Sequence, residues 1–251
     1  SRLPGFIETA LLGASHLPSL PPVVHDVVAS FHGPGSQSFD HVVFVFFDAF
    51  GWESLQRFRD SSHFLRQFDN RGLVAKTTCQ FPSATAAHIA TSFCGLPAYE
   101  HKICGWDYYE PSVGRMIRPL KFAFTDEPQP DSLRRAGVRP ETVLPPSRII
   151  PVLTSQGVTV RFRGPQEYYA STFNMAYGQS EGYRSLDHGV AQVVDLIKAR
   201  PHKSYQHLYI DSYDSTCHKF GIGAPQSDEV ARKALESLKG LLQDPRFHPH
   251  F

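Results

Sequence analysis

Apolar stretches alternate with amphipathic stretches along most of this chain. Residues 41–47 (HVVFVFF) form a continuous apolar run, a pattern typical of a strand that is buried on both faces of a parallel sheet. Further strands are predicted at residues 73–81, 158–162 and 206–210. Amphipathic spacing and capping signals predict helices near residues 7–12 and at 53–68, 85–93, 149–156, 186–199 and 228–242.

The alternation of strands and helices predicts an α/β fold, a doubly wound, mostly parallel sheet flanked by helices. Gly95 is placed to end the third helix, and Ser227 is placed to cap the last one. Residues 104–147 contain seven Pro and three Gly with little periodicity. We expect them to form an irregular cap insertion within a single domain that spans residues 1–251.

Three polar residues follow three predicted strands, at the ends where ligands bind in open α/β sheets. Asp48 directly follows the first run, and a carboxylate there is costly to bury unless it is paired or bound to a cation. Its alternative role is to cap the next helix. Thr85 follows a proline turn and begins a helix, where free backbone N–H groups favour a phosphate. Thr85 could equally be an ordinary helix cap, and Ser83 is a rival nucleophile.

The third position is the pair Asp214 and His218, four residues apart after the last strand. If this segment is helical, both side chains lie on one face, and a carboxylate with an imidazole suits zinc. Asp211 is a competing carboxylate, and the pair could instead be a helix cap with a surface histidine. The convergence of Asp48, Thr85 and Asp214 on one sheet edge is the strongest argument for a site.

The composition excludes several partner classes. Hydrophobic residues make up 41% of the chain, charged residues 20%, and the net charge is +1, which favours neither a nucleic-acid duplex nor an anionic membrane as partner. No apolar run reaches the ~18 residues of a membrane span. The four cysteines form no CxxC pair. Free thiols slightly favour a cytoplasmic location, and a secreted or periplasmic one after signal removal stays open.

Together these stretches resemble the alkaline phosphatase superfamily, and within it the type I phosphodiesterase/nucleotide pyrophosphatase family. The residues that carry the resemblance are HVVFVFFDAFGW, then FPSATAAHIATSFCGLPAYEHKI with Gly95, Leu96 and His101 in step, then YDSTCHKFG. The sulfatase branch is excluded, because CQFPSA lacks its Cys-x-Pro-x-Arg pattern.

The resemblance implies a hydrolase of phosphodiester or pyrophosphate bonds that works through a phosphothreonine at Thr85. It implies two divalent metal ions, which we expect to be zinc. Asp214 and His218 would hold one ion, and Asp48 and Thr85 the other. The alternatives are a phosphomonoesterase, a phosphonate hydrolase, or an incomplete domain that acts as a binding module.

The sequence departs from this family in two ways. Where family members place a phosphate-contacting Asn, this chain has Cys-Gly-Trp, and Trp106 could stack on a substrate base or pack in the core. The family's later Asp-His-Gly and final His ligands are also not found in order. Asp187–Gly189 is rejected because it precedes Asp214 and opens a helix, and His248 and His250 lie too close to the end. We therefore expect a small phosphodiester or nucleotide substrate and a site completed by a C-terminal segment or a second chain.

Overall fold

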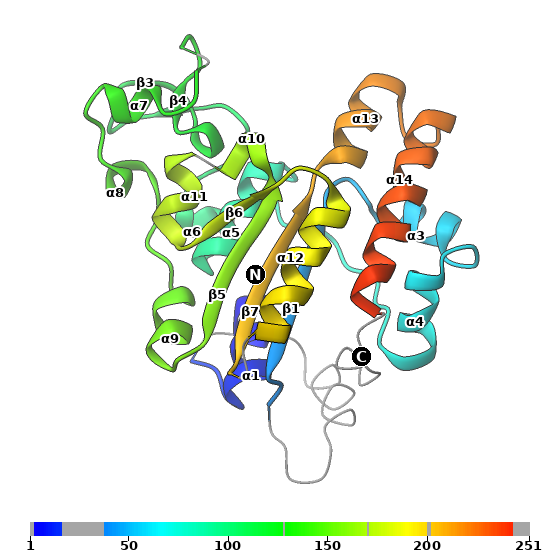
Figure 1. The fold of residues 1–251 in the computed structure, drawn as a ribbon. Coiled ribbons are helices and arrows are strands. Elements are labelled where there is room, and N and C mark those ends of the chain that lie inside the picture. The colour runs from blue at the N-terminus through cyan, green and yellow to red at the C-terminus, as the bar shows by residue number, and fades with distance from the viewer. Residues whose placement is uncertain (1–2, 17–37, 128, 170, 200–201, 243–251) are drawn as a thin grey trace.

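The computed structural model describes residues 3–16, 38–127, 129–169, 171–199 and 202–242. At its centre is a four-stranded sheet in the order β1-β7-β5-β6, formed by β1 (His41–Phe47), β7 (Ser204–Ile210), β5 (Thr159–Pro165) and β6 (Ser180–Tyr183). Every pair of neighbouring strands is parallel. All four carboxyl ends therefore lie at one edge of the sheet (Figure 1), as the α/β prediction requires.

Helices cover both faces of this sheet, and β1 shows how the sequence sorts its residues between them. Val42, Phe44 and Phe46 pack on one core cluster, whereas Val43, Val45 and Phe47 pack on the other, because successive side chains of a strand point to opposite faces. The first core is covered by α1 (Leu3–Leu12), α5 (Thr85–Cys94), α9 (Ile150–Ser155), α10 (Gln166–Tyr169) and α11 (Thr172–Tyr177).

The second core is covered by α3 (Trp52–Phe58), α4 (His63–Arg71), α12 (Leu186–Ala199), α13 (Ser212–Phe220), α14 (Pro225–Leu238) and the 3₁₀ turn η2 (Lys239–Leu242). The prediction of one helix over residues 53–68 is wrong. The chain turns after Phe58, and Ser62 begins α4 by accepting a hydrogen bond from the Leu65 amide at 3.3 Å.

The α14 start also differs from the prediction. Ala224 is the N-cap, and Pro225 lies in the first turn. The first turn suits proline, because proline has no amide hydrogen that would be left without a partner there. The Ser227 hydroxyl instead donates to the Gly221 carbonyl at 2.8 Å. By contrast, the predicted end of α5 is confirmed, because Gly95 caps it in the left-handed region with φ of 80°.

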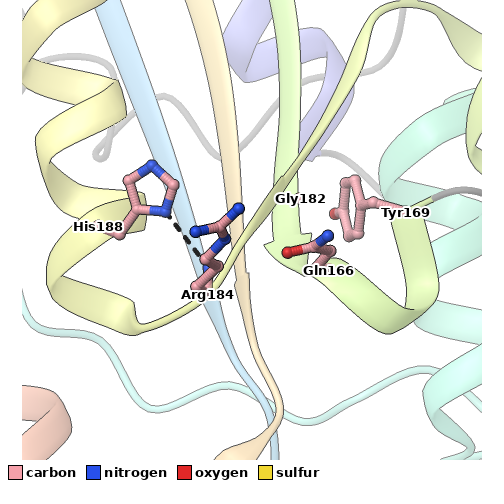
Figure 2. A pocket seen from close by; sticks show the side chains of 5 residues that line it. All are labelled: Gln166, Tyr169, Gly182, Arg184 and His188. Atoms are coloured by element: carbon pink, nitrogen blue, oxygen red, sulfur yellow. Dashed lines mark hydrogen bonds between the residues drawn. The ribbon is translucent and has the colours of Figure 1, made fainter.

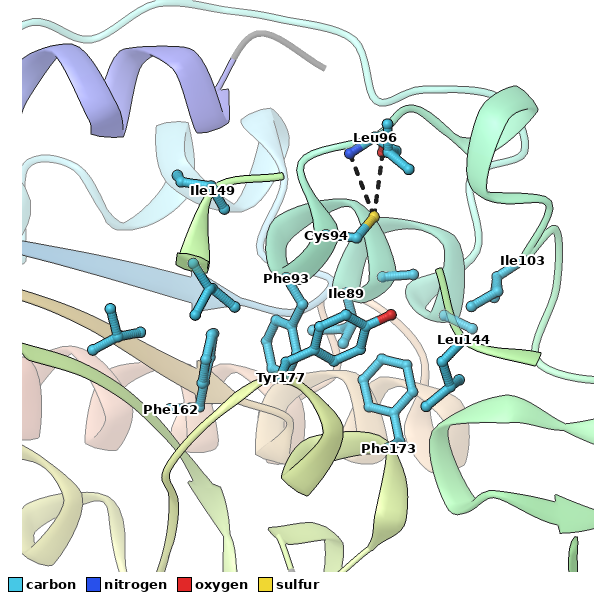
Figure 3. Packing of buried hydrophobic residues seen from close by; sticks show 14 of the residues in the cluster. Ile89, Phe93, Cys94, Leu96, Ile103, Leu144, Ile149, Phe162, Phe173 and Tyr177 are labelled. Atoms are coloured by element: carbon cyan, nitrogen blue, oxygen red, sulfur yellow. Dashed lines mark hydrogen bonds between the residues drawn. The ribbon is translucent and has the colours of Figure 1, made fainter. Parts of the chain in front are cut away.

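Residues 104–147 are more regular than their composition predicts. They contain a small antiparallel sheet of β2 (Tyr108–Glu110), β3 (Arg115–Arg118) and β4 (Ala123–Phe124), with α7 (Ser132–Arg135), α8 (Pro140–Val143) and the 3₁₀ turn η1 (Pro119–Lys121). Ile117, Phe124 and Leu133 join the same core cluster as Phe93 and Phe162 of α5 and β5. Figure 3 shows part of this core cluster, with Phe93, Phe162, Phe173 and Tyr177 among its labelled side chains.

The edge of the sheet at β1 departs from the prediction in two respects. All seven residues of β1 are half-buried rather than buried, because among the described residues β1 pairs only with β7. Residues 73–81, predicted as a strand, belong to no strand, and most of them are exposed. Cys79, within this segment, is exposed as well. An apolar pattern alone does not make a strand when no neighbouring edge supplies hydrogen bonds.

Candidate active site

A cavity of about 560 Å³ opens at the carboxyl edge of the sheet, above β1 and β7. Five residues that the sequence singled out line it together: Asp48, Thr85, Trp106, Asp214 and His218. The two rivals Ser83 and Asp211 line it too. The strand ends thus bring together residues up to 170 positions apart, as the topology predicts.

Asp48 is the most constrained of these side chains, with 9% of its surface exposed. Its Oδ1 accepts from the Ala49 amide at 3.0 Å, and its Oδ2 accepts from the Tyr209 hydroxyl at 2.8 Å and the Thr85 hydroxyl at 3.2 Å. Burial, and after it the charge of Asp48, raises the pKa of Tyr209. Tyr209 therefore stays protonated, and its hydroxyl holds the Asp48 carboxylate in place by donating a hydrogen bond to it.

Thr85 is the first residue of α5, and the N-cap is Ala84, which makes no side-chain cap. The hydroxyl is thus not used to cap its own helix. It faces Asp48 across the cavity instead, so the interpretation of Thr85 as an ordinary helix cap is wrong. Thr85 thus lies at a helix N-terminus, where free backbone N–H groups favour an anion, and its hydroxyl contacts the Asp48 carboxylate.

Asp214 and His218 lie one turn apart on α13, with His218 Nε2 3.4 Å from Asp214 Oδ2. Burial raises the pKa of the Asp214 carboxyl, and the charge of Asp48 raises it further. Burial also raises the pKa of Asp211. Carboxylates that repel one another in a partly buried cavity are stabilised by a cation, and these donors are of the kinds that zinc takes.

The described residues supply only part of the ligands that two metal ions need. Two expected ligands of each ion line this cavity: Asp214 and His218 for one, and Asp48 and Thr85 for the other. No group of three His, Cys, Asp or Glu side chains among the described residues could hold a metal ion. A zinc site normally has three or four protein ligands.

Aromatic side chains form much of the remaining wall. Trp106 is 42% exposed and lines the cavity, so the alternative that it packs in the core is wrong. Arg118 lies 5.9 Å from its ring centre and is itself held by Asp107 at 2.8 Å. Tyr168 and Tyr169 line the same cavity.

Lys121, Asn174 and Tyr209 are among the lining residues that the sequence did not single out. Tyr209 lies inside an apolar strand, where an aromatic residue indicates core packing. Asn174 is buried and donates to the Tyr168 carbonyl at 2.9 Å. No local pattern marks either one, because their place in the cavity depends on the fold.

The histidine of the family-like motif, His101, is buried in the protein interior and does not line the cavity. Its Nε2 lies 3.0 Å from the Thr91 hydroxyl and 3.1 Å from the Ala87 carbonyl, while its Nδ1 accepts from the Ile103 amide at 3.0 Å. It ties α5 to the short helix α6 (Ala98–His101). Asp187–Gly189 opens α12, as predicted, and does not line this cavity. His248 and His250 lie outside the described residues.

The described part of the chain has no helix that is long and apolar enough to span a membrane.

Comparison with known proteins identifies the family of this chain. The family model described as type I phosphodiesterase/nucleotide pyrophosphatase matches residues 42–244. No curated protein matches the chain.

Two solved structures of murine ectonucleotide pyrophosphatase/phosphodiesterase 5 share the fold. One is an inactive variant in complex with AMP, with a TM-score of 0.61, 18% identity and coverage of 83% of this chain and 54% of that chain. The other has a TM-score of 0.61 and 17% identity, with coverage of 83% and 53%. The chain thus spans about half the length of the structures it matches.

Proposed function

Because the chain belongs to the type I phosphodiesterase/nucleotide pyrophosphatase family, we propose that its cavity carries out metal-dependent hydrolysis of phosphodiester or pyrophosphate bonds. One observation carries this proposal: the Thr85 hydroxyl, at the start of α5, donates to the buried Asp48 carboxylate in a cavity that also holds Asp214 and His218. A positioned hydroxyl, carboxylates and an imidazole are the parts that phosphoryl transfer needs.

Thr85 is the nucleophile. Its Oγ gives up its proton and forms a bond to phosphorus while the bond to the leaving oxygen breaks, and that oxygen leaves with a proton. The intermediate is a phosphothreonine whose phosphorus keeps the substrate's second ester group. Water then gives up a proton and adds to phosphorus, the bond to Oγ breaks, and Oγ takes up a proton as the phosphate monoester product leaves. Asp48 accepts the hydroxyl's hydrogen bond and so fixes the direction of Oγ, and Tyr209 holds Asp48 in place.

Asp214 and His218 would hold one metal ion, and Asp48 and Thr85 would hold the other. Two zinc ions bound there would supply positive charge for the entering and leaving oxygens. The remaining ligands come from a C-terminal segment or a second chain. The half-buried apolar strand β1, unpaired on one side within the described residues, is the edge on which such a segment would add a strand.

The substrate is a small phosphodiester or nucleotide. Trp106, together with Tyr168, supplies flat apolar surface beside the Thr85 hydroxyl, and aromatic rings stack readily on bases. Lys121 is a cation among the lining carboxylates and suits a phosphate oxygen.

Hydrolysis of bis-p-nitrophenyl phosphate in the presence of zinc, by the chain together with the segment or second chain that completes its metal site, tests the proposal. Thr85→Ala should lower kcat by more than ~10³-fold, since the covalent route is lost, while the folded structure is kept. Ser83→Ala is the matched control, because Ser83 lines the same cavity and should keep most of the activity. The reverse result, a dead Ser83→Ala with an active Thr85→Ala, would show that the other hydroxyl attacks.

A second candidate is a binding module that has kept the fold. It is favoured by the lack of three converging metal-binding side chains among the described residues. Elemental analysis for zinc on the chain together with the segment or second chain that completes its metal site separates the two, since a binding module would hold none. A phosphomonoesterase or phosphonate hydrolase is distinguished by comparing the diester with p-nitrophenyl phosphate and a phosphonate ester.

A further inference from the structure

A second cavity, of about 580 Å³, opens at the same sheet edge beyond β5 and β6. Figure 2 shows the side chains that line it: Gln166, Tyr169, Gly182, Arg184 and His188. Only Tyr169 also lines the Thr85 cavity. The aromatic ring is therefore shared between two cavities whose polar residues differ.

The path of the chain explains why a crevice lies here. After β5 the chain enters α10 and α11, whose Tyr169 and Phe173 pack in the first core. After β6 it enters α12, whose Val190 and Val193 pack in the second core. Neighbouring strands thus lead to helices on opposite faces, and ligands of open α/β sheets bind in the crevice that such a divergence leaves.

Paired glycines shape the inner wall of this cavity. Gly164 and Gly182 are register partners at the ends of β5 and β6. A Cβ on Gly164 would lie 2.1 Å from the Tyr169 ring, and one on Gly182 would lie 2.7 Å from the Gln166 Cα. Only glycine at both positions lets α10 lie across the strand ends, which brings Gln166 and Tyr169 to the cavity.

The lining carries hydrogen-bond donors and no carboxylate. The Arg184 amide donates to His188 Nδ1 at 3.3 Å, so in the neutral ring Nε2 carries the proton. The nearby Glu181 carboxylate already pairs with Arg163 at 3.1 Å, whereas no described carboxylate forms an ion pair with Arg184. A free guanidinium beside an imidazole and an amide is a set of donors that suits a phosphate.

We propose that this second cavity binds a phosphate group of a small molecule, with Arg184 as its principal contact and His188 and Gln166 as further donors. The site goes beyond the proposed function, since binding there needs neither Thr85 nor a metal ion. The phosphate has two possible sources with the same chemistry: a second phosphate of the hydrolysed substrate, or a separate phosphate compound.

Titration with inorganic phosphate tests the site, followed by amide chemical shifts and calorimetry on the full chain without added metal. Arg184→Gln should weaken phosphate binding at least tenfold, and the wild-type shifts should centre on residues 182–188. Arg66→Gln on α4 is the matched control, because Arg66 is an exposed arginine that lines neither cavity. The Arg66→Gln variant should bind phosphate as the wild type does, and in Thr85→Ala the phosphate-induced shifts at residues 182–188 should be the same as in the wild type.

Equal phosphate affinity in wild type and Arg184→Gln, or shifts confined to the Thr85 cavity, would overturn the proposal. Because the titration measures binding, it tests the phosphate site even if the chain hydrolyses no substrate. Kinetics then identify the source. A rise in KM in Arg184→Gln for a dinucleotide polyphosphate, but not for bis-p-nitrophenyl phosphate, identifies the substrate's second phosphate, whereas an unchanged KM for both identifies a separate compound.

Discussion

At the scale of single residues, the site is a set of hydrogen bonds around Asp48. The sequence predicted Asp48 and Thr85 because each follows a strand or begins a helix, where a polar residue stands out. It did not predict Tyr209, which donates to Asp48 from inside β7. Within an apolar strand an aromatic residue is indistinguishable from a core residue, and only the folded register shows which neighbour its hydroxyl meets.

The clustered carboxylates are expected to cost stability when no metal ion is bound. Burial and the charge of Asp48 raise the pKa of Asp214, so its ionised form is disfavoured in the folded state at neutral pH. Asp214→Asn should therefore raise the melting temperature in EDTA by about 1–3 °C. Zinc should stabilise the wild type more than the variant. A lower melting temperature for Asp214→Asn in EDTA would contradict this electrostatic account.

A buried histidine in the core makes the free energy of unfolding depend on pH in the acid range. Burial lowers the pKa of His207 to about 3, from 6.5, and its ring lies among Phe44, Phe93 and Phe162. The unfolded chain therefore binds more protons between pH 6.5 and 3, and stability falls as the pH falls through that window. Burial lowers the pKa of His101 as well, with the same sign.

Urea unfolding at pH 7 and pH 5 measures this effect. The loss of unfolding free energy between the two should be about 2 kcal/mol smaller in His207→Leu than in the wild type. His101 remains in the variant and should leave a residual slope. An equal loss in both proteins would show that His207 is protonated in the folded state.

At the scale of elements, the predictions succeeded where pattern and local chemistry agree. β1 and α12 have the predicted bounds, and α5 begins at Thr85 and ends before Gly95. The prediction failed at residues 73–81 because a strand needs a partner edge, which no local pattern reveals. β6 was missed because Ser-Glu-Gly-Tyr is short and carries little apolar signal.

The end of α5 offers a test of local backbone chemistry. Gly95 has φ of 80°, a region in which a Cβ is strained. Gly95→Ala should cost ~1 kcal/mol of unfolding free energy, measured by urea denaturation. Gly95→Asn should cost less, because Asn tolerates the left-handed region. If both variants are as stable as the wild type, Gly95 does not hold the end of this helix.

At the scale of the whole molecule, the sheet has two kinds of edge. β6 is short, as sheet edges often are, whereas β1 is a seven-residue apolar strand whose residues are all half-buried. The sequence predicted β1 as a strand buried on both faces. The candidate site lies at the end of this strand, so a further strand added there would bring its own residues to the cavity.

The proposal predicts that a C-terminal segment bearing Asp-His-Gly completes the metal site. The 251-residue chain alone should bind zinc weakly or at one site only, and should hydrolyse phosphodiesters poorly. Extension by such a segment should give two zinc ions per chain by elemental analysis, together with activity. Two tightly bound zinc ions and full activity in the 251-residue chain alone would show that the ligand assignment is wrong, and Asp187 and His188 would need reconsideration.

The most direct measurement of the central claim is to trap the covalent intermediate. A single turnover of a phosphodiester on the zinc-loaded, extended protein is quenched in acid, and the peptide containing residues 83–88 is sequenced by mass spectrometry. The account predicts the substrate's phosphoryl group, still carrying its second ester group, on Thr85, and no such group in Thr85→Ala. Phosphate on Ser83, or turnover at the normal rate with no phosphorylated peptide, would contradict it.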